Sequence, residues 1–404
     1  MIYDIGNLAL LPIRSNDDFS RRLANHFGLS DPDKLVINRA WSNGEYCPII
    51  TDILDKDSEP RLEGRTACIV YSYTQSYLSN TEAFARILLL SDAAYRNGAD
   101  DVVLIMAESL FDRQDLDPSI KYKHGFGDIS DKLRKKALCM QGQAFSLESV
   151  VGHFRHAGIS RVLTLDRHSN ESERVYAHIY SKDASEVLFN LDPVPIFVNY
   201  ALQLPIDLSD SGQNLVLLAP DKNAWGSVDT FQGLSGLCNA SVVYCDKNRE
   251  VPNDPNRLKA SISKTSDNFR GVKDKIVVAI DDKADTMGTL RTTLVEDLTT
   301  DGKPRQLHAF ITHMIMSTRS AYEDIYTHRI NLHGSNSHPN MTFKKDEPGV
   351  ENITVIDFTP YFAWALVNHV LPGIPIQECT KENLDNFREL YSVIKQGKIV
   401  DYMS

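Results

Sequence analysis

Three carboxylates stand close together in the second half of the chain. Asp281 and Asp282 are adjacent, and Asp285 comes directly before the run Thr286-Met287-Gly288-Thr289. Carboxylates bind sugar hydroxyls or a magnesium ion, and the backbone N–H groups at the start of a helix favour a phosphate. These residue types predict a ligand that carries both a phosphate and a diol, which is the chemistry of a ribose phosphate.

A strand before the acids and a helix after them are expected to position this loop. Residues 276–280 are apolar and rich in β-branched side chains, so they predict a buried strand that the two acids end. Leu290, Leu294 and Leu298 then recur at helical spacing, and Asp301-Gly302 ends the pattern. The competing interpretation is that the acids only terminate a strand and cap a helix.

Bulk composition narrows the class of protein. A chain of 404 residues with 42% hydrophobic residues favours two domains with ample buried cores. The net charge of −11 argues against a nucleic-acid-binding surface. The apolar runs are too short to span a bilayer and no signal peptide is visible, so we expect a cytoplasmic protein with no membrane partner. Six scattered cysteines without a Cys-x-x-Cys motif fit reduced thiols.

Strand and helix patterns alternate through the first half of the chain. The expected strands cover residues 8–13, 36–40, 66–72, 101–107 and 160–165, and the expected helices cover 15–28, 79–97 and 145–156. Ser15 or Asn16 is expected to cap the first helix, and Ser79 with Glu82 forms a capping box for the second. This alternation predicts a mostly parallel sheet covered by helices. Residues 108–141 interrupt it and read as a long lid.

The pattern restarts near residues 185–200. The expected strands of the second half cover residues 215–219, 241–244, 276–280, 306–313 and 352–358, and the expected helices include 317–328 and 361–370. Residues 334–350 read as an inserted loop. We therefore predict an α/β protein with one domain at residues 1–185, a related domain at 186–376 and a helical tail at 377–404, with ligands at the carboxyl ends of the strands.

Charged and polar residues follow several of these expected strands. They are Trp41, Asn43 and Glu45; Arg113, Gln114 and Asp115; Asp166 and His168; Asp221; Lys247 and Arg249; and the loop from Asp281 to Thr289. In order and spacing the set resembles the ribose-phosphate pyrophosphokinase family, from about residue 8 to about residue 370. The resemblance implies two tandem phosphoribosyltransferase-like domains, each a mostly parallel sheet flanked by helices.

The resemblance also implies a role for each residue. Trp41, Asn43, Glu45, Arg113, Gln114 and Asp115 would bind ATP, and His168, Asp221 and Asp166 would form the Mg²⁺ site. Lys247 and Arg249 would be catalytic, clamping the transferring phosphoryl group. Asp281, Asp282 and Asp285 would hold the ribose, and Thr286, Met287, Gly288 and Thr289 its 5-phosphate. The family transfers diphosphate from ATP to ribose 5-phosphate in nucleotide biosynthesis, and its members are usually homo-oligomers.

Each residue also has an ordinary interpretation when taken alone. Trp41 fits a core position, His168 a strand end, and Asp221 a turn. Arg167, between Asp166 and His168, departs from the apolar residue usual in the family. The acceptor therefore stays open between ribose 5-phosphate and a 5′-substituted ribose such as ADP-ribose. A non-catalytic regulatory homologue is disfavoured by Lys247 and Arg249, and a phosphoribosyltransferase is disfavoured by the nucleotide-binding set.

Overall fold

The computed structural model describes most of the chain. The described residues are 8–51, 62–72, 78–115, 117, 142–249, 258–291, 302–338 and 347–370. Most of the expected lid at 108–141, the middle of the loop at 334–350 and the whole tail at 377–404 lie outside them. The expected helical positions Leu294 and Leu298 also lie outside them.

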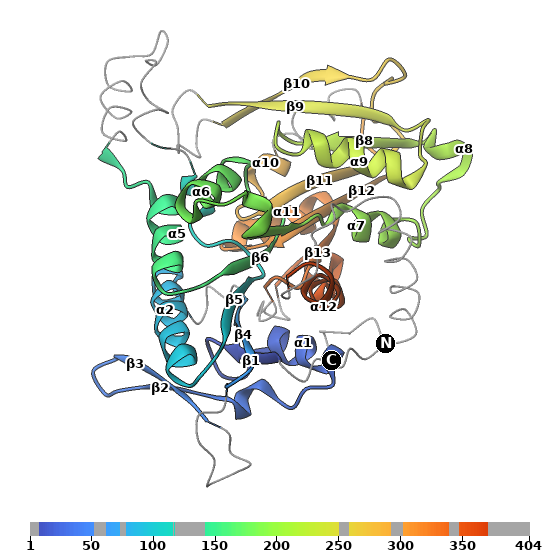
Figure 1. Cartoon of the computed structure of the whole chain (residues 1–404). Helices are drawn as coiled ribbons and strands as arrows, with labels where there is room; N and C mark the ends of the chain where they lie inside the picture. The colour runs from blue at the N-terminus through green and yellow to red at the C-terminus, as the bar shows by residue number, and fades with distance from the viewer. Residues whose placement is uncertain are drawn as a thin grey trace.

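The first half contains a parallel sheet with helices (Figure 1). In chain order its elements are β1 (Leu8–Pro12), α1 (Asp18–Phe27), η1 (Pro32–Lys34), β2 (Val36–Ala40), β3 (Tyr46–Ile50), β4 (Thr66–Tyr71), α2 (Asn80–Arg96), β5 (Asp101–Met106), η2 (Asp112–Gln114), α5 (Ser146–His156), β6 (Arg161–Leu165), α6 (Glu171–Tyr180), η4 (Ala184–Glu186), β7 (Leu188–Leu191) and α7 (Val194–Ala201).

The second half follows after a short connection. Its elements are α8 (Ser209–Gly212), β8 (Leu215–Ala219), α9 (Trp225–Ser235), β9 (Ser241–Arg249), β10 (Leu258–Thr265), β11 (Ile276–Ala284), α10 (Gly288–Leu290), β12 (Gln306–Met314), α11 (Arg319–His328), β13 (Ile330–Ser335), η8 (Val350–Asn352), β14 (Ile353–Ile356), α12 (Thr359–Ala365) and a closing π-helix, η9 (Leu366–Val370).

The predicted α/β fold with parallel sheets is confirmed. One sheet has the order β1-β4-β5-β6-β7 and the other β10-β9-β8-β11-β12-β13-β14. Every pairing in the two sheets is parallel except that of β9 with β10. Because parallel strands end at a common edge, loops far apart in the sequence meet there. β2 and β3 form a separate antiparallel hairpin.

The two halves repeat one plan. In each, a first strand is followed by two strands of an antiparallel pair, then by four parallel strands that add outward in sequence order. A short helix follows the last strand, α7 in one half and α12 in the other. Both helices begin with the same turn, in which Asp192 accepts from the Val194 N–H and Asp357 from the Thr359 N–H, each at 2.9 Å.

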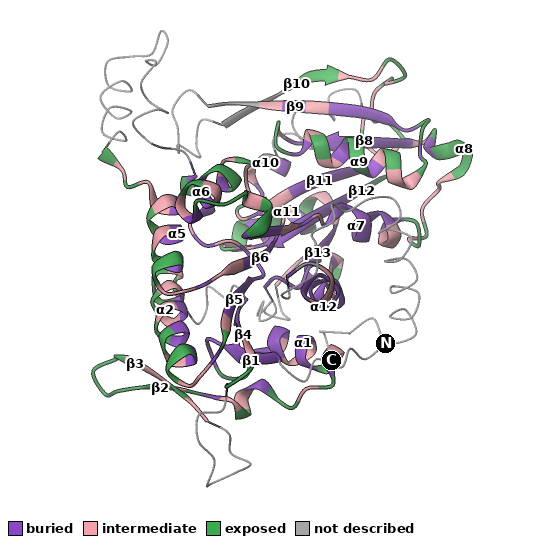
Figure 2. Ribbon diagram, viewed as in Figure 1, coloured by how far each residue is buried: buried purple, intermediate pink, exposed green. Residues whose placement is uncertain are grey.

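One buried apolar cluster joins the two sheets. It includes Leu10, Val103 and Leu163 from the first sheet and Leu217, Val278 and Phe310 from the second. Phe19 of α1 packs edge-on against Phe362 of α12, with ring centroids 5.2 Å apart. Figure 2 shows most strands of the two sheets as a buried interior beside partly exposed helices, whereas most residues of the hairpin β2–β3 are half-buried or exposed. The halves therefore share a core, although each sheet also has its own on its other face.

Several local expectations need correction. The strand β7 pairs with β6, so the boundary predicted between residues 185 and 186 would cut the last strand from the first sheet. The strand β13 occupies the start of the loop predicted at 334–350, because its pairing with two parallel neighbours outweighs its polar composition. Asp17, rather than Ser15 or Asn16, caps α1 by accepting from the Ser20 N–H at 2.9 Å.

The central strand also differs from its predicted end. β11 continues through the two acids to Ala284, because Asp281, Lys283 and Ala284 pair with β12. The acids therefore project from a strand instead of a loop, which fixes their directions. The carboxyl end of this strand is the part that positions the site described below.

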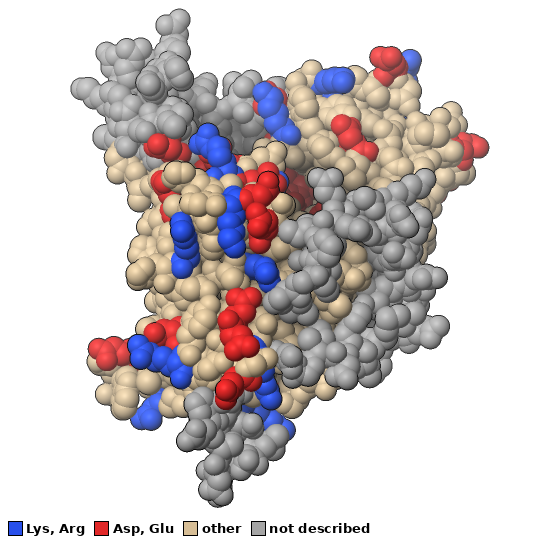
Figure 3. All heavy atoms as spheres, viewed as in Figure 1, with Lys and Arg blue, Asp and Glu red and all other residues tan. Residues whose placement is uncertain are grey.

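Charge on the face shown in Figure 3 is mixed, with acidic and basic side chains interspersed.

No described helix has the length and apolar character needed to cross a membrane.

Candidate active site

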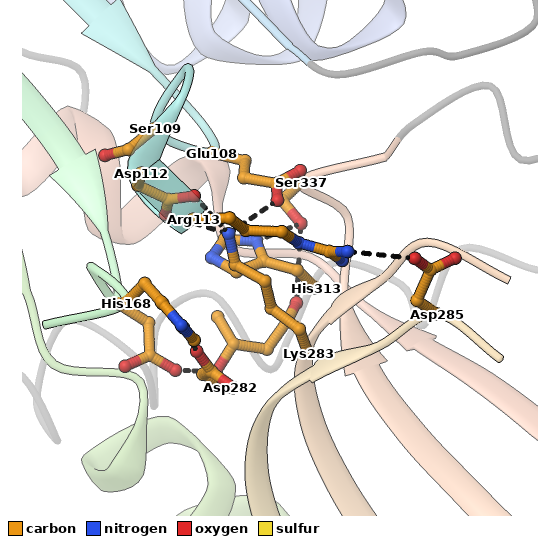
Figure 4. A network of polar contacts seen from close by, with 12 residues as sticks. Glu108, Ser109, Asp112, Arg113, His168, Asp282, Lys283, Asp285, His313 and Ser337 are labelled. Atoms are coloured by element: carbon orange, nitrogen blue, oxygen red, sulfur yellow. Dashed lines mark hydrogen bonds and ion pairs between the residues drawn. The ribbon is translucent and has the colours of Figure 1, made fainter. Parts of the chain in front are cut away.

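Polar side chains from both halves meet where the carboxyl ends of the strands face one another (Figure 4). The segments after β5 and β6 contribute Asp112, Arg113 and His168, and the end of β11 contributes Asp282, Lys283 and Asp285. Ion pairs of Arg113 with Asp285, His168 with Asp282, and Lys283 with Asp112 cross between the halves here. Four of the residues predicted from strand ends, Arg113, His168, Asp282 and Asp285, thus lie close together.

His168 and Asp282 form the most direct of these contacts. The His168 Nδ1 lies 2.7 Å from an Asp282 carboxylate oxygen. Burial lowers the pKa of His168, but the hydrogen bond and charge of Asp282 outweigh it and raise the pKa overall. Burial raises the pKa of Asp282, but His168 and Lys283 outweigh it and hold this pKa at about 2. An ionised carboxylate therefore faces an imidazole that holds its proton more firmly than usual.

Asp166 lies beside this pair in an unusual electrostatic position. Its backbone has a positive φ of 46°, which turns the chain sharply after β6. Its carboxylate accepts a hydrogen bond from the Thr312 hydroxyl of the other half. Burial and the negative charge of Asp282 raise the pKa of Asp166 to about 8. Asp166 and Asp282 thus bring two negative charges close together, and a divalent cation bound there would neutralise them.

Asp221 adopts the turn that its ordinary interpretation describes. Its carboxylate accepts from the backbone N–H groups of Asn223, at 2.9 Å, and Ala224, at 3.3 Å, ahead of α9. The Asn223 side chain reaches the His168 carbonyl oxygen at 3.5 Å. The loop after β8 therefore lies against the loop after β6. The three predicted metal ligands occupy neighbouring strand ends.

Lys283 is a site residue that the sequence did not predict. Its Nζ lies 2.8 Å from both carboxylate oxygens of Asp112 and 2.9 Å from Glu108, and its side chain is only 6% exposed. Burial disfavours the ammonium form, but the charges of Asp112 and Glu108 raise its pKa. Burial and the charge of Glu108 raise the pKa of Asp112. Lys283 thus ties the end of β11 in one half to the segment after β5 in the other.

A second ion pair lies at the more exposed side of the site. The Arg113 guanidinium lies 3.1 Å from Asp285, which also accepts from the Ser317 hydroxyl. Burial disfavours the charge of Arg113, but Asp285 raises its pKa. Gln114 accepts from the Ser146 hydroxyl, and Asp115 is buried. A sugar hydroxyl that bound Asp285 would compete with Arg113 and Ser317.

The predicted phosphate loop turns sharply after β11. Met287 has a positive φ of 58° and is buried, and Gly288 begins α10. A bulky residue rarely adopts this conformation, and strained backbone often occurs at ligand loops. Thr286 is exposed, and the side chain of Thr289 lies outside the described set.

Lys247 and Arg249 lie in the last part of β9. The order β9-β8-β11 is parallel throughout, so the carboxyl end of β9 is on the same edge of the sheet as Asp281. Lys247 pairs with Ala260 of β10, and Arg249 with Leu258. Only the backbones of Lys247 and Arg249 are described.

The hairpin β2–β3 holds the remaining predicted residues away from the site. Trp41 is 51% exposed at its tip, with the Arg39 guanidinium 4.4 Å from the ring centroid. Asn43 and Glu45 are exposed beside it, and the Asn43 side chain accepts from the Glu45 N–H at 3.2 Å. Figure 1 shows the hairpin at the bottom of the molecule, well away from β11 and α10 in the upper part. The fold does not bring this part of the predicted nucleotide set to Arg113 within one chain.

Buried polar residues on β12 and after β13 also reach the site. The His313 ring lies 3.1 Å from the Leu165 carbonyl oxygen and 3.0 Å from the Ser337 hydroxyl, and burial lowers its pKa to about 4. His338 lies 3.1 Å from Glu108. Neither histidine was predicted. The run Asn336-Ser337-His338 repeats the spacing of Asp166-Arg167-His168, which was the available signal.

Comparisons with known proteins agree on one family. The ribose-phosphate pyrophosphokinase of Cereibacter sphaeroides is 25% identical over 283 residues, which is 70% of each chain. The enzyme of the same name from Clostridium tetani is 28% identical over 317 residues, or 78% of this chain and 81% of the relative. No family model matches the chain.

A solved structure shares the fold over nearly the whole chain. The crystal structure of phosphoribosylpyrophosphate synthetase from Mycobacterium smegmatis superposes with a TM-score of 0.64 and 16% sequence identity, covering 97% of this chain and all of that one. The sequence relatives, the shared architecture and the acids gathered at the strand ends agree. The chain is therefore similar in sequence to ribose-phosphate pyrophosphokinases over most of its length, and it has the tandem phosphoribosyltransferase-like fold.

Proposed function

We propose that this protein transfers the diphosphate group of ATP to the anomeric hydroxyl of ribose 5-phosphate, giving phosphoribosyl pyrophosphate and AMP. The contact that carries the proposal is that of His168 with Asp282, at 2.7 Å. It joins the expected metal side of one half to the expected sugar side of the other. The names of the sequence relatives support the same reaction.

The sugar is expected to lie along the end of β11. Asp281, Asp282 and Asp285 would accept hydrogen bonds from its hydroxyls, and Thr286 to Thr289 would bind its 5-phosphate through backbone N–H groups. Arg113, which contacts Asp285, would then be released towards the nucleotide. The anomeric oxygen attacks the β-phosphorus, the bond from that phosphorus to the α-phosphate oxygen breaks, and AMP leaves.

The residues at the ends of β6, β8 and β11 suit Mg²⁺. Asp166, Asp221 and Asp282 offer the carboxylate oxygens that this ion prefers, and His168 contacts Asp282. The raised pKa of Asp166, caused by burial and by the charge of Asp282, marks an excess of negative charge there. When bound, Mg²⁺ would neutralise charge on the phosphate oxygens. Asp166 would then give up its proton to become a ligand.

Lys247 and Arg249 would stabilise the transferring group. Phosphoryl transfer depends chiefly on positioning and on neutralising the equatorial oxygens, which a mobile ammonium and a bidentate guanidinium do well. Their place at the carboxyl end of β9, on the edge that holds Asp281, supports this role. Removing such a cation costs about 3 kcal/mol of transition-state stabilisation or more.

The nucleotide-binding site would be completed by a second copy of the chain. Arg113 and Gln114 lie at the site, whereas Trp41, Asn43 and Glu45 lie on a distant hairpin. An exposed tryptophan at the tip of a projecting hairpin suits stacking on adenine. We therefore propose a homo-oligomer in which the hairpin of one protomer reaches the strand ends of another. The described cysteines form no disulfide with one another, which suits a reducing cytoplasm.

The test incubates the protein with Mg²⁺, ATP and separate ribose derivatives, and detects AMP. We expect AMP with ribose 5-phosphate. AMP formed only with ADP-ribose would favour a 5′-substituted acceptor. If none of the ribose derivatives gave AMP, the proposal would be contradicted. Lys247→Ala should abolish turnover while ATP binding, measured by calorimetry, stays largely intact. Turnover that survives in Lys247→Ala would remove the catalytic role of this residue.

A regulatory or phosphoribosyltransferase function predicts different results. A regulatory homologue would bind ATP without forming AMP, and a phosphoribosyltransferase would need no ATP. Asp282→Asn provides the matched loss-of-function control, because Asp282 is expected to contact the sugar and the metal.

A further inference from the structure

Three ligand-capable side chains from both halves converge on one buried point beside the proposed active site. They are Glu108, which follows β5, His313 of β12, and His338, which follows β13. The three residues are 5%, 0% and 4% exposed, and one ligand atom from each lies within 4.8 Å of the other two. Among the described residues this is the cluster whose geometry could hold a metal ion.

The surroundings of His313 match those of a metal-binding imidazole. Its Nε2 lies 3.1 Å from the Leu165 carbonyl oxygen, which can only accept, so Nε2 carries the proton and Nδ1 has the lone pair. Metal-binding histidines usually donate their other N–H in this way, which fixes the ring. The Ser337 hydroxyl contacts Nδ1 at 3.0 Å but also lies 3.4 Å from the Thr312 carbonyl oxygen. That second acceptor would allow Ser337 to release Nδ1 to an ion.

The carboxylate of Glu108 is arranged in a complementary way. One oxygen lies 2.9 Å from the Lys283 ammonium, which is the kind of support that ligating carboxylates receive. The other oxygen is buried without a hydrogen bond in the described structure, although it lies 3.1 Å from the Nε2 of His338. Two donors on a tetrahedral ion with bonds near 2.0 Å are about 3.3 Å apart, so this separation suits a shared ion.

The local charge balance also favours a cation. Lys283 brings one positive charge to two buried carboxylates, Glu108 and Asp112. The group therefore has net negative charge, which is costly in a buried place. A divalent ion between Glu108 and the two imidazoles would offset it.

We propose that Glu108, His313 and His338 form a buried Zn²⁺ site that joins the two halves of the molecule. The donor set of two imidazole nitrogens and one carboxylate oxygen suits zinc, whereas Mg²⁺ prefers oxygen donors in octahedral geometry. This site is distinct from the Mg²⁺ site proposed around His168. His338 nevertheless corresponds to His168 in the internal repeat. The Asn336 N–H donates to Ile356 as the Asp166 N–H donates to Leu191, both at 3.0 Å.

The test measures metal content and stability of the full chain after dialysis against a chelator. On addition of Zn²⁺ the wild-type protein should retain about one ion per chain after gel filtration and should gain about 3 °C or more in Tm. In His338→Gln the Zn²⁺ affinity should fall about 100-fold or more and the Tm shift should vanish. Co²⁺ in the wild-type protein should give the intense visible absorption of a tetrahedral ion.

Two matched variants separate this site from the proposed active site. His168→Gln should lose turnover but keep the tight Zn²⁺, whereas the exposed His153→Gln should keep both. Wild-type protein that binds no Zn²⁺, or equal Zn²⁺ content in the wild type and His338→Gln, would overturn the inference. A weak octahedral Co²⁺ spectrum would do the same without depending on any variant. Zn²⁺ content and the Co²⁺ spectrum are measured without substrate, so neither bears on whether AMP is formed from ribose 5-phosphate.

Discussion

At the scale of single residues, the site combines the predicted aspartates with a buried lysine that was not predicted. Asp282 and Asp285 were predicted from their spacing, but the residue between them that holds the two halves together at the site is Lys283. Its ammonium is paired with Asp112 and Glu108, far away in the sequence. Removing one member of a buried ion group leaves charge unpaired in a place with little water.

We therefore predict that Lys283→Met lowers the free energy of unfolding by about 3–5 kcal/mol. The methionine keeps the volume of the side chain but leaves Asp112 and Glu108 facing each other. Urea unfolding followed by circular dichroism measures the change. Adding Glu108→Gln and Asp112→Asn to this variant should restore much of the loss, because the uncompensated charges are then gone.

A surface ion pair provides the control for this prediction. Arg96 pairs with Asp92 on α2 at 2.7 Å, with both side chains largely exposed. Arg96→Met should leave the urea midpoint unchanged, because water screens this pair. Equal stability of Lys283→Met and the wild type would mean that the buried group is not held by charge.

At the scale of elements, the hairpin β2–β3 and the strand ends of β5 and β11 are separate units of the proposed nucleotide site. The hairpin holds Trp41, and the strand ends hold Arg113 and Asp282. If the hairpin serves a neighbouring protomer, defects in the two units can be complemented in a mixed oligomer.

We predict that Trp41→Ala and Asp282→Asn are each nearly inactive, and that mixing them restores part of the activity. An oligomer that contains both variants has some sites with an intact hairpin and intact strand ends. AMP formation after the two proteins are unfolded and refolded together provides the measurement. Each variant refolded alone is the control, and absence of any recovery would argue that the hairpin acts on its own chain or not at all.

The strands β12 and β13 hold a buried histidine pair whose protonation is linked to stability. His308 and His333 stack with their rings 8° from parallel, and the Nδ1 of His308 is 3.0 Å from the Nε2 of His333. Burial, together with the charge of His308, lowers the pKa of His333 to about 3. The folded protein thus keeps His333 neutral at a pH where the unfolded chain becomes protonated.

The sign of the pH effect follows from this lowered pKa. The stability that depends on neutral His333 is fully present above the pKa of about 6.5 that histidine has in the unfolded chain. It is lost as the pH falls towards 3, by up to about 1.4 kcal/mol per pH unit. His333→Gln should flatten this part of the dependence of unfolding free energy on pH. The exposed His153→Gln should keep the wild-type slope, and an unchanged slope in His333→Gln would refute the assignment.

At the scale of the whole molecule, the shared core should make the two halves unfold together. Phe19 is fully buried between α1 and α12, in the cluster that also contains strands of both sheets. Calorimetry of the wild type should therefore give one cooperative transition. Phe19→Ala should lower the free energy of unfolding by about 3–5 kcal/mol and shift that single transition.

Leu89 on α2 supplies the contrasting position, because it is 46% exposed. Leu89→Ala should change the unfolding free energy by about 0.5 kcal/mol or less. Two separated transitions in the wild type, with only one shifted by Phe19→Ala, would show that the halves unfold independently.

The sequence by itself determined the types of most elements, because hydrophobic periodicity is a local property. β1, β8 and α5 appear close to their predicted bounds for this reason. It also identified the acids of β11, since adjacent carboxylates after an apolar strand are visible in one segment. β10 and β13 were not predicted, because pairing with neighbouring strands, and not their own residue pattern, makes them strands.

Only the tertiary structure decided which distant residues meet. The partners of Lys283, the contact of His168 with Asp282, and the cluster of Glu108, His313 and His338 each join residues from different halves. No local pattern encodes such pairs, because they depend on two sheets packing with their strand ends face to face. The hairpin β2–β3, which carries Trp41, lies away from β11 and α10, although the family resemblance had assigned Trp41 and Arg113 to one nucleotide site.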